Sequence, residues 1–550
     1  MEAGGVLASL RGTVGPRRRA AVLAGAAATV LGSLAPWTVF DGGTLGSTAP
    51  AGTPGGVRLY VLLLTAGTLV ALTETAGRRR AGLAAAGGIV CVAAGAPAAA
   101  AAVGDGAGWG AGLALAGGLV LLAAAASLPD DRSPPELRPM ATWVEVSALA
   151  AVALGSLAAV TIGLRIEEAG LFTAYLVFLA AIWAWLRALG VLEGLRGLYE
   201  RRRGPTIALA AFTAALFPFT QGGNAYWIRV LASVGVFAVA AIGLNVVVGL
   251  AGLLDLGYVA FFGVGAYVGA LFADAALTTL HVHLPFLLVV VLGALIAAVF
   301  GVAIGAPTLR LRGDYLAIVT LGFGEIFRIS AFNLDGLTRG PNGISGVPDL
   351  AVGGFNFGET HTLLGIELPS FANYYAVELL LLAVVATGFL RLNDSRIGRA
   401  WIAIREDETA AAAMGIDTTR LKLLAFGIGA FMAGAAGTVN SHVTSQVSPD
   451  SYTFLESILL LAAVVLGGMG TVGGALLGSV ALFVIPEKLR SFADARLLLF
   501  GAALVLMMRF RPEGIVPSRR RARELRDVEE APRPTPGAVG APPGAPVART

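Results

Sequence analysis

Apolar runs of about 20 residues recur along most of this chain, and they constrain its fold more than any other feature. A helix of about 20 residues crosses the ~30 Å of hydrocarbon in a bilayer. Of the 550 residues, 56% are hydrophobic and only 13% are charged, whereas a soluble domain has about 25% charged residues. The runs are continuously apolar and do not alternate at every second residue, which disfavours a β-barrel. The sequence therefore predicts an all-α, polytopic membrane helix bundle.

We expect about 14–16 membrane segments, some of them shorter than a full crossing. The candidate runs are 20–40, 57–76, 81–103, 107–128, 142–163, 170–191, 205–220, 224–249, 256–273, 284–306, 314–332, 373–390, 421–440, 454–468, 471–485 and 495–508. Arginines cluster in alternate loops of this arrangement, as at 17–19, 78–80, 201–203, 391–422 and 519–521. Basic loops mark the cytoplasmic side. The pattern predicts that both termini are cytoplasmic.

Several function classes are disfavoured by the composition. The net charge is +4, but the basic residues lie in loops between apolar runs, so we expect membrane lipid and no nucleic acid as a partner. The single cysteine, Cys91, excludes a disulfide framework. His281 and His283 have no further ligand nearby and are better explained as loop residues than as a metal site. We predict no metal and no cofactor.

The chain also lacks a nucleotide site of its own. A P-loop requires G-x-x-x-x-G-K-[ST], and the only lysines, Lys422 and Lys488, stand in TTRLKLLAF and IPEKLRSF. A literal G-x-G-x-x-G begins at Gly468, but membrane-length apolar runs flank it instead of a βαβ unit. Glycines spaced by four, such as Gly265 and Gly269, instead favour close packing of spans. We expect neither an ATPase nor any other enzyme.

One inner loop, 391–422, stands out because 11 of its residues are charged. Acidic residues stabilise the start of a helix, alanine is the best helix former, and glycine commonly ends a helix. The stretch 403–416, AIREDETAAAAMGI, therefore predicts a short cytoplasmic helix with a small-residue face, although an ordinary solvated connector is an equal alternative on these grounds.

Five stretches, in order, resemble the permeases of branched-chain amino-acid ABC importers, of the LivM type. They are GLNVVVGLAGLLDLGYVAFFGVGAYVGAL (243–271), LRLRGDYLAIVTLGFGEIFRI (309–329) with RGPNGISGVP (339–348), GRAWIAIREDETAAAAMGIDTTRLKLLAF (398–426), VSPDSYTFLESILLLAAVVLGGMGTVGGALLG (447–478) and FRPEGIVP (510–517). In that family the loop at 398–426 docks on the ATP-binding subunit. This sequence has one residue more than the general E-A-A-x-x-x-G pattern, since Thr409 follows Glu408, while Gly415 falls in place.

The resemblance implies a bacterial inner-membrane permease subunit of an ATP-driven importer. Its partners would be a homologous second permease subunit, two ATP-binding subunits and an extracytoplasmic substrate-binding protein, and its small-molecule substrate would be a branched-chain amino acid. Urea or short amides are carried by close relatives. The coupling residues would be Arg405, Glu406, Asp407, Glu408, Ala410, Ala411 and Gly415. A secondary transporter or channel that works alone is the alternative class, but few acidic residues lie in the apolar runs to form an ion relay.

Polar residues inside apolar runs are the candidates for the translocation path. Asn245, Asp255, Tyr258 and Tyr267 bracket a glycine-rich stretch that suggests an interrupted helix, and such helices offer backbone groups to substrates. Glu325 lies deep in its run, with Arg328 three residues on and able to pair with it. Ordinary packing, and for Arg328 extension towards the outer surface, are the alternatives.

We predict three regions. Residues 1–204 form an N-terminal transmembrane extension, and 205–517 form the permease core, with an outer loop at 333–372 and the cytoplasmic coupling loop at 391–422. Residues 518–550 form a Pro/Gly/Ala-rich cytoplasmic tail that the composition predicts to be disordered.

Overall fold

The computed structural model describes residues 24–29, 31, 39–40, 43–44, 109–126, 141–166, 172, 175, 179, 182–183, 186, 191–273, 284–308, 314–352, 354–363, 365–488, 501, 505, 509 and 514–516. The predicted spans at 57–76 and 81–103 lie outside these residues, as do Cys91, His281, His283 and the tail at 518–550. The chain divides into two compact units, Met1–Thr220 and Gln221–Thr550, which we describe one at a time.

In the described residues of unit Met1–Thr220, the elements are helices and one short strand pair. Strand β1 (Val39–Phe40) pairs antiparallel with β2 (Gly43–Thr44). The described helices are α5 (Trp109–Ala126), α6 (Thr142–Arg165), α8 (Val191–Arg201) and α9 (Arg203–Thr220).

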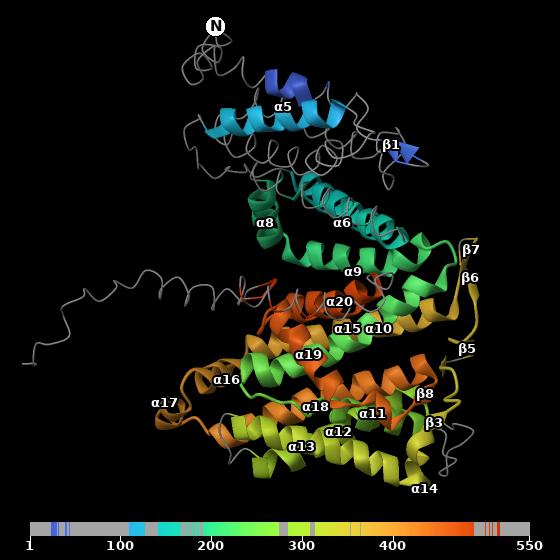
Figure 1. Cartoon of the computed structure of the whole chain (residues 1–550). Helices are drawn as coiled ribbons and strands as arrows, with labels where there is room; N and C mark the ends of the chain where they lie inside the picture. Colours follow the sequence, from blue (N-terminus) through green and yellow to red (C-terminus); the bar gives the residue numbers. More distant parts are fainter. Residues whose placement is uncertain are drawn as a thin grey trace, which may run out of the picture. The chain divides into compact units, whose positions relative to one another are not determined.

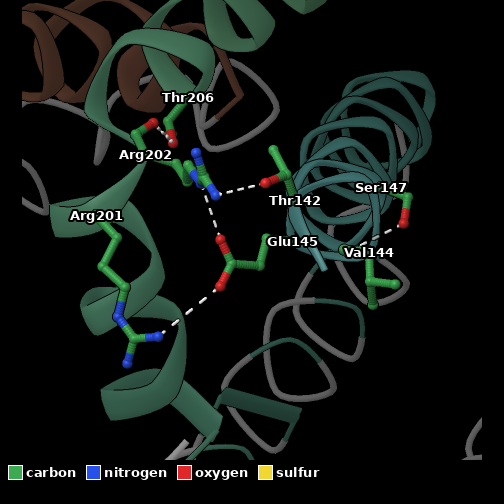
Figure 2. Close-up of polar contacts among 7 residues, drawn as sticks. All are labelled: Thr142, Val144, Glu145, Ser147, Arg201, Arg202 and Thr206. Carbon is green, nitrogen blue, oxygen red and sulfur yellow. Dashed lines mark hydrogen bonds and ion pairs between the residues drawn. The ribbon is translucent and has the colours of Figure 1, made fainter. Parts of the chain in front are cut away.

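Helices α6 and α9 run parallel and are fastened at both ends. At one end the carboxylate of Glu145, which is 3% exposed, accepts from Nε of Arg202 at 2.9 Å, and Nη1 of Arg201 lies 3.8 Å from it. Figure 2 shows Arg202 reaching both Glu145 and the hydroxyl of Thr142, 2.8 Å away. At the other end the Thr161 and Thr220 hydroxyls are 3.1 Å apart, and Arg165 donates to the Thr220 carbonyl.

These contacts bear on the boundary between extension and core. The boundary predicted at 204/205 falls inside α9, whereas the compact units divide at 220/221. The helix at 205–220 packs on α6, so it belongs with the N-terminal unit. The sequence of an apolar run does not indicate which neighbouring helix the run will pack against.

Unit Gln221–Thr550 is an all-α bundle whose strands are all short pairs (Figure 1). Its helices are α10 (Ala225–Leu244), the π-helix η1 (Asn245–Leu250), α11 (Val259–Phe272), α12 (Phe286–Thr308), α13 (Asp314–Asn333), α14 (Asp335–Thr338), the 3₁₀ turn η2 (Gly340–Asn342), α15 (Ser370–Asn393), α16 (Arg396–Glu406), α17 (Glu408–Ala413), α18 (Thr418–Thr444), the 3₁₀ turn η3 (Pro449–Ser451), α19 (Phe454–Gly467) and α20 (Val472–Lys488). Its strands are β3 (Ile344–Ser345), β4 (Ala351–Val352), β5 (Phe355–Asn356), β6 (His361–Leu363), β7 (Ile366–Leu368) and β8 (Gln446–Val447).

The predicted membrane bundle is confirmed. Among the described residues, 7 helices are long and apolar enough to cross a membrane. They are Thr142–Arg165, Ala225–Leu250, Phe286–Pro307, Tyr315–Asn333, Ser370–Asn393, Thr418–Thr444 and Pro449–Gly467. The chain is therefore a multi-pass membrane protein.

The two long loops of the second unit lie at opposite ends of its bundle. Figure 1 shows α16 and α17 at one end and strands β3 to β8 at the other. Strand β3, in the loop after α13, pairs with β8, which follows α18, through Ile344–Val447 and Ser345–Gln446. We call these the loop end and the strand end of the bundle.

The interrupted helix predicted near the glycine-rich stretch is present. Helix α10 continues into η1 and stops at Leu250, the segment 251–258 is not helical, and α11 begins at Val259. In hydrocarbon every backbone polar group needs a partner within the protein. The segment 251–258 must therefore be supported by other elements.

Helices α11, α12 and α18 approach one another closely at glycines. A Cβ on Gly265 would lie 2.0 Å from the carbonyl oxygen of Gly434, and one on Gly437 would lie 1.9 Å from that of Phe262. The Thr438 hydroxyl lies 2.9 Å from the carbonyl oxygens of both Gly265 and Gly434. Small residues thus allow backbone to meet backbone, as they do generally between membrane helices.

We expect Gly265→Ala to destabilise the bundle by about 1–3 kcal/mol, because the added methyl group collides with the backbone of α18. The temperature at which half of the detergent-solubilised chain is no longer monodisperse should fall. Gly305→Ala in α12 is the matched control, since its methyl group would meet side-chain atoms no closer than 3.5 Å. Equal midpoints for the two variants would contradict this packing.

We expect Glu145→Gln to loosen the junction of α6, α8 and α9 by roughly 1–2 kcal/mol, because Arg201 and Arg202 lose their buried carboxylate while staying partly hydrated. Trypsin should cleave after Arg201, Arg202 or Arg203 faster than in the unmodified chain. Glu200→Gln removes the exposed pair with Arg196, 3.6 Å away, and serves as the control. An unchanged cleavage rate in Glu145→Gln would refute the role of this cluster.

Candidate functional site

Helix α16 begins the charged loop and is held against the bundle by an apolar face. The Ser395 side chain caps its first turn by accepting from the Gly398 backbone N–H at 3.2 Å. Trp401 and Ile404 are buried, and Nε1 of Trp401 donates to the Leu421 carbonyl at 2.7 Å. Arg396, Arg399 and Glu406 of α16 are exposed, whereas Trp401 joins the helix to α18.

Helix α17 is the short helix that the sequence predicts, and its boundaries have a local cause. The Asp407 carboxylate caps it by accepting from the backbone N–H groups of Thr409 and Ala410 at 2.8 and 2.9 Å. The helix ends at Ala413, and Gly415 follows in the left-handed region at φ +85°, which glycine adopts without penalty. Glu406 ends the preceding helix and does not begin this one.

Two charged contacts fix this loop to the bundle. Nη1 of Arg405 donates to the Gly249 carbonyl at 2.7 Å, and Gly249 is part of η1. The Glu408 carboxylate lies 2.5 Å from Nζ of Lys422, whose side chain is only 7% exposed. A buried ammonium strongly requires its carboxylate partner. Glu408→Lys would therefore displace α17 itself.

The predicted coupling residues separate into two groups. Arg405, Glu408 and Ala411 face the bundle, whereas Glu406, Asp407, Ala410 and Gly415 are exposed. Sequence reasoning missed Met414, which is 84% exposed at the end of α17, and Lys422. A lone lysine in the first turns of an apolar helix, near an acidic loop, is a signal that could have suggested its role.

The candidate path residues Asn245, Asp255 and Tyr258 are fully buried and hydrogen-bonded. Asn245 donates to the Thr471 carbonyl at 3.0 Å and accepts from the Gly470 N–H at 2.7 Å, so it holds the turn between α19 and α20. Asp255 accepts from the Gly257 N–H at 3.0 Å. The Tyr258 hydroxyl donates to the Gly429 carbonyl of α18 at 2.7 Å.

The other two candidates lie apart from these. Tyr267 is buried among rings, with its centroid 6.2 Å from that of Phe327 and 6.1 Å from that of Tyr452, and within the described residues its hydroxyl has no hydrogen-bond partner. Glu325 lies at the surface of α13 and pairs with Arg328, whose Nη2 is 2.5 Å away. The predicted pairing of Glu325 with Arg328 is confirmed. The five candidates thus lie in different surroundings.

The glycine turn at 468–473 has a structural role. It joins α19 to α20, and Gly470 and Thr471 bond to Asn245. The backbone N–H groups of Ile515 and Val516 donate to the carbonyls of Leu466 and Gly467 at 2.9 and 2.8 Å. Across the described part of the chain, no group of three or more His, Cys, Asp or Glu residues could hold a metal ion.

Comparison with known proteins identifies the core. A family model for the branched-chain amino acid transport system, permease component, matches residues 226–508, more than half of the chain. No solved structure matches the chain.

Curated relatives agree with this match. The high-affinity branched-chain amino acid permease protein LivM of Salmonella typhimurium is 43% identical, over 52% of this chain and 68% of the relative. LivM of Escherichia coli is 38% identical, over 62% of this chain and 83% of the relative. LivH of Salmonella typhimurium, also a permease protein of that system, is 28% identical over 51% of this chain and 91% of the relative. This membrane protein therefore belongs to the family of permease components of the branched-chain amino acid transport system.

Proposed function

We propose that this chain is a permease subunit of an ATP-driven importer of branched-chain amino acids, and that separate ATP-binding subunits drive it through α16 and α17. The observation that carries the proposal is the construction of α17. Its exposed surface consists of small residues and Met414, while Arg405, Glu408 and Ala411 hold it to the bundle. A partner could approach α17 closely. Because α17 is held to the bundle, displacing α17 would also move the part of the bundle that it contacts.

The contacts behind α17 supply a route for that displacement. Arg405 bonds to Gly249 in η1, and Asn245 of the same π-helix bonds to the turn between α19 and α20. Trp401 joins α16 to α18. Movement of the loop therefore acts on the interrupted helix first, and on α18, α19 and α20 through these hydrogen bonds. Alternating access would follow from the resulting tilt of the spans.

The orientation that fits this role puts the loop end of the bundle in the cytoplasm. The termini would then both be cytoplasmic, in a bacterial inner membrane, and the strand end would meet an extracytoplasmic substrate-binding protein. A homologous second permease subunit would complete the path, as the resemblance to both LivM and LivH supports. The first compact unit, Met1–Thr220, would form an added transmembrane extension, and 518–550 a cytoplasmic tail. The chain would transport without acting as an enzyme.

We expect Ala412→Glu with Met414→Glu to lower capture of the ATP-binding subunits by this chain at least tenfold, because the two carboxylates charge the small exposed surface of α17. The thermal midpoint of the chain should not change, since both positions are exposed. Thr362→Glu with Ser345→Glu is the matched control, because it adds the same two carboxylates at exposed positions of the strand end. If the double variant captures the ATP-binding subunits normally, α17 is not part of the docking surface.

We expect Arg405→Gln to separate ATP hydrolysis from transport. The complex should assemble and hydrolyse ATP, but L-leucine uptake into proteoliposomes should fall at least fivefold, because α16 no longer donates to the Gly249 carbonyl. Arg420→Gln is the control, since Arg420 pairs with Asp417 at the surface at 3.0 Å. Uptake equal to that of the unmodified complex would show that Arg405 does not transmit the movement.

A further inference from the structure

Helix α13 carries a partly exposed ion pair on its outer side. The Glu325 carboxylate lies 2.5 Å from Nη2 and 2.9 Å from Nε of Arg328, and the side chains are 42% and 28% exposed. Most of the other exposed residues of α13 are apolar, among them Ile318, Ile326 and Ile329. The pair is thus a charged feature of a largely apolar helix face.

Glu325 lies near the middle of the span, and Arg328 lies about 8 Å from its Asn333 end. At 1.5 Å per residue, Glu325 is about 16 Å from the Asp314 end of a helix about 30 Å long. Arg328 does not extend towards the nearer helix end but turns back to Glu325. Charged groups at this depth are costly in lipid and are found facing protein or water. This face of α13 therefore does not border hydrocarbon.

The rotation of α13 is fixed by its other side. Phe327 packs against Tyr267 and Tyr452, with ring centroids 6.2 and 6.1 Å away. The Thr320 hydroxyl accepts from the backbone N–H of Leu256, in the non-helical segment, at 3.0 Å. With these residues facing inwards, Glu325 and Arg328 are held on the outer side of the helix.

A purely structural role explains the pair poorly. Both partners are on one helix, three residues apart, so their bond joins no two elements and adds little to stability. Glu145 and Arg202, by contrast, connect α6 to the junction of α8 and α9. Arg328 is also attracted by the Asp450 carboxylate of η3. The bond between Glu325 and Arg328 itself, however, joins no two elements, and it lies at a depth where charge is costly.

We propose that this face of α13 borders the substrate path at the contact with the second permease subunit, and that Glu325 and Arg328 receive the zwitterionic head of the amino acid. The inference rests on the proposed function and adds a site to it. The guanidinium of Arg328 would bind the α-carboxylate in two parallel hydrogen bonds, and Glu325 would accept from the α-ammonium. The isoleucines of the same face would contact the aliphatic side chain.

Charge balance supports this assignment. A zwitterion placed between Glu325 and Arg328 exchanges one ion pair for two and leaves the net charge unchanged. Each charge of the substrate then leaves water with a partner of opposite sign, which is the condition under which charged groups are tolerated in a low-dielectric region. The resting pair likewise neutralises itself when no substrate is bound.

The test uses the complete complex in proteoliposomes and measures uptake of radiolabelled L-leucine. We expect Glu325→Gln and Arg328→Gln each to lower uptake at least tenfold while assembly and basal ATP hydrolysis stay within twofold. The charge swap E325R/R328E should assemble but remain at least tenfold slower, since it exchanges the carboxylate and ammonium positions relative to the isoleucines. Swapping the exposed pair Arg196 and Glu200 of α8 is the control, with uptake within twofold.

Recovery of uptake by the E325R/R328E swap would reveal a structural pair and overturn the inference, as would normal uptake by either single variant. If the unmodified complex shows no ATP-driven uptake of L-leucine, the proposed function fails instead. The two failures are therefore distinguishable.

A second measurement does not depend on the charged residues. In a Cys91→Ala background, Ile326→Cys on this face should react with a membrane-impermeant cationic thiol reagent, and saturating L-leucine with binding protein should slow the reaction at least threefold. Val299→Cys of α12, at a position 67% exposed on an apolar helix, should not react. An unreactive Ile326→Cys, or a rate that L-leucine leaves unchanged, would also overturn the inference.

Discussion

The demand that buried backbone groups be hydrogen-bonded within the protein organises this bundle. The segment 251–258 and the π-helix before it satisfy only part of their own backbone, for example by the bond from the Leu253 N–H to the Val247 carbonyl. Side chains of other elements bond to further backbone groups at this interruption. Arg405 donates to the Gly249 carbonyl, Thr320 accepts from the Leu256 N–H, and Ser457 accepts from the Val259 N–H at 3.2 Å. Elements α16, α13 and α19 therefore meet at this interrupted helix because the interruption leaves backbone groups that need partners. A continuous helix would need none of these bonds.

This arrangement places the proposed coupling loop and the proposed substrate face on the same segment. Arg405 contacts it from the loop, and Thr320 contacts it from α13, a few residues before Glu325 on the same helix. A change in the loop can thus reach α13 through bonds that the fold already requires. No separate relay of polar residues is needed between the two regions.

The sequence predicts much of this and leaves out particular parts for physical reasons. Composition and run length predict the membrane bundle, the glycine-rich stretch predicts the interrupted helix, and the acid–alanine–glycine pattern predicts α17. These are local signals. Which partner each group meets is not local: Glu408 finds Lys422, α9 packs on α6, and Glu325 faces outwards although its depth in the run suggested an inner position. Periodicity gives the face of a helix but not what lies against that face.

Helix α18 has a consequence for communication across the membrane. Its 27 residues make a rod of about 40 Å, longer than the ~30 Å of hydrocarbon. One end follows α17, and the other end leads into β8, which pairs with β3. A single rigid body therefore presents a surface on each side of the bilayer. A ligand at one end of α18 that prefers one tilt of this helix changes the affinity for a second ligand at the other end by some factor. By thermodynamic linkage, the second ligand then changes the affinity for the first by the same factor.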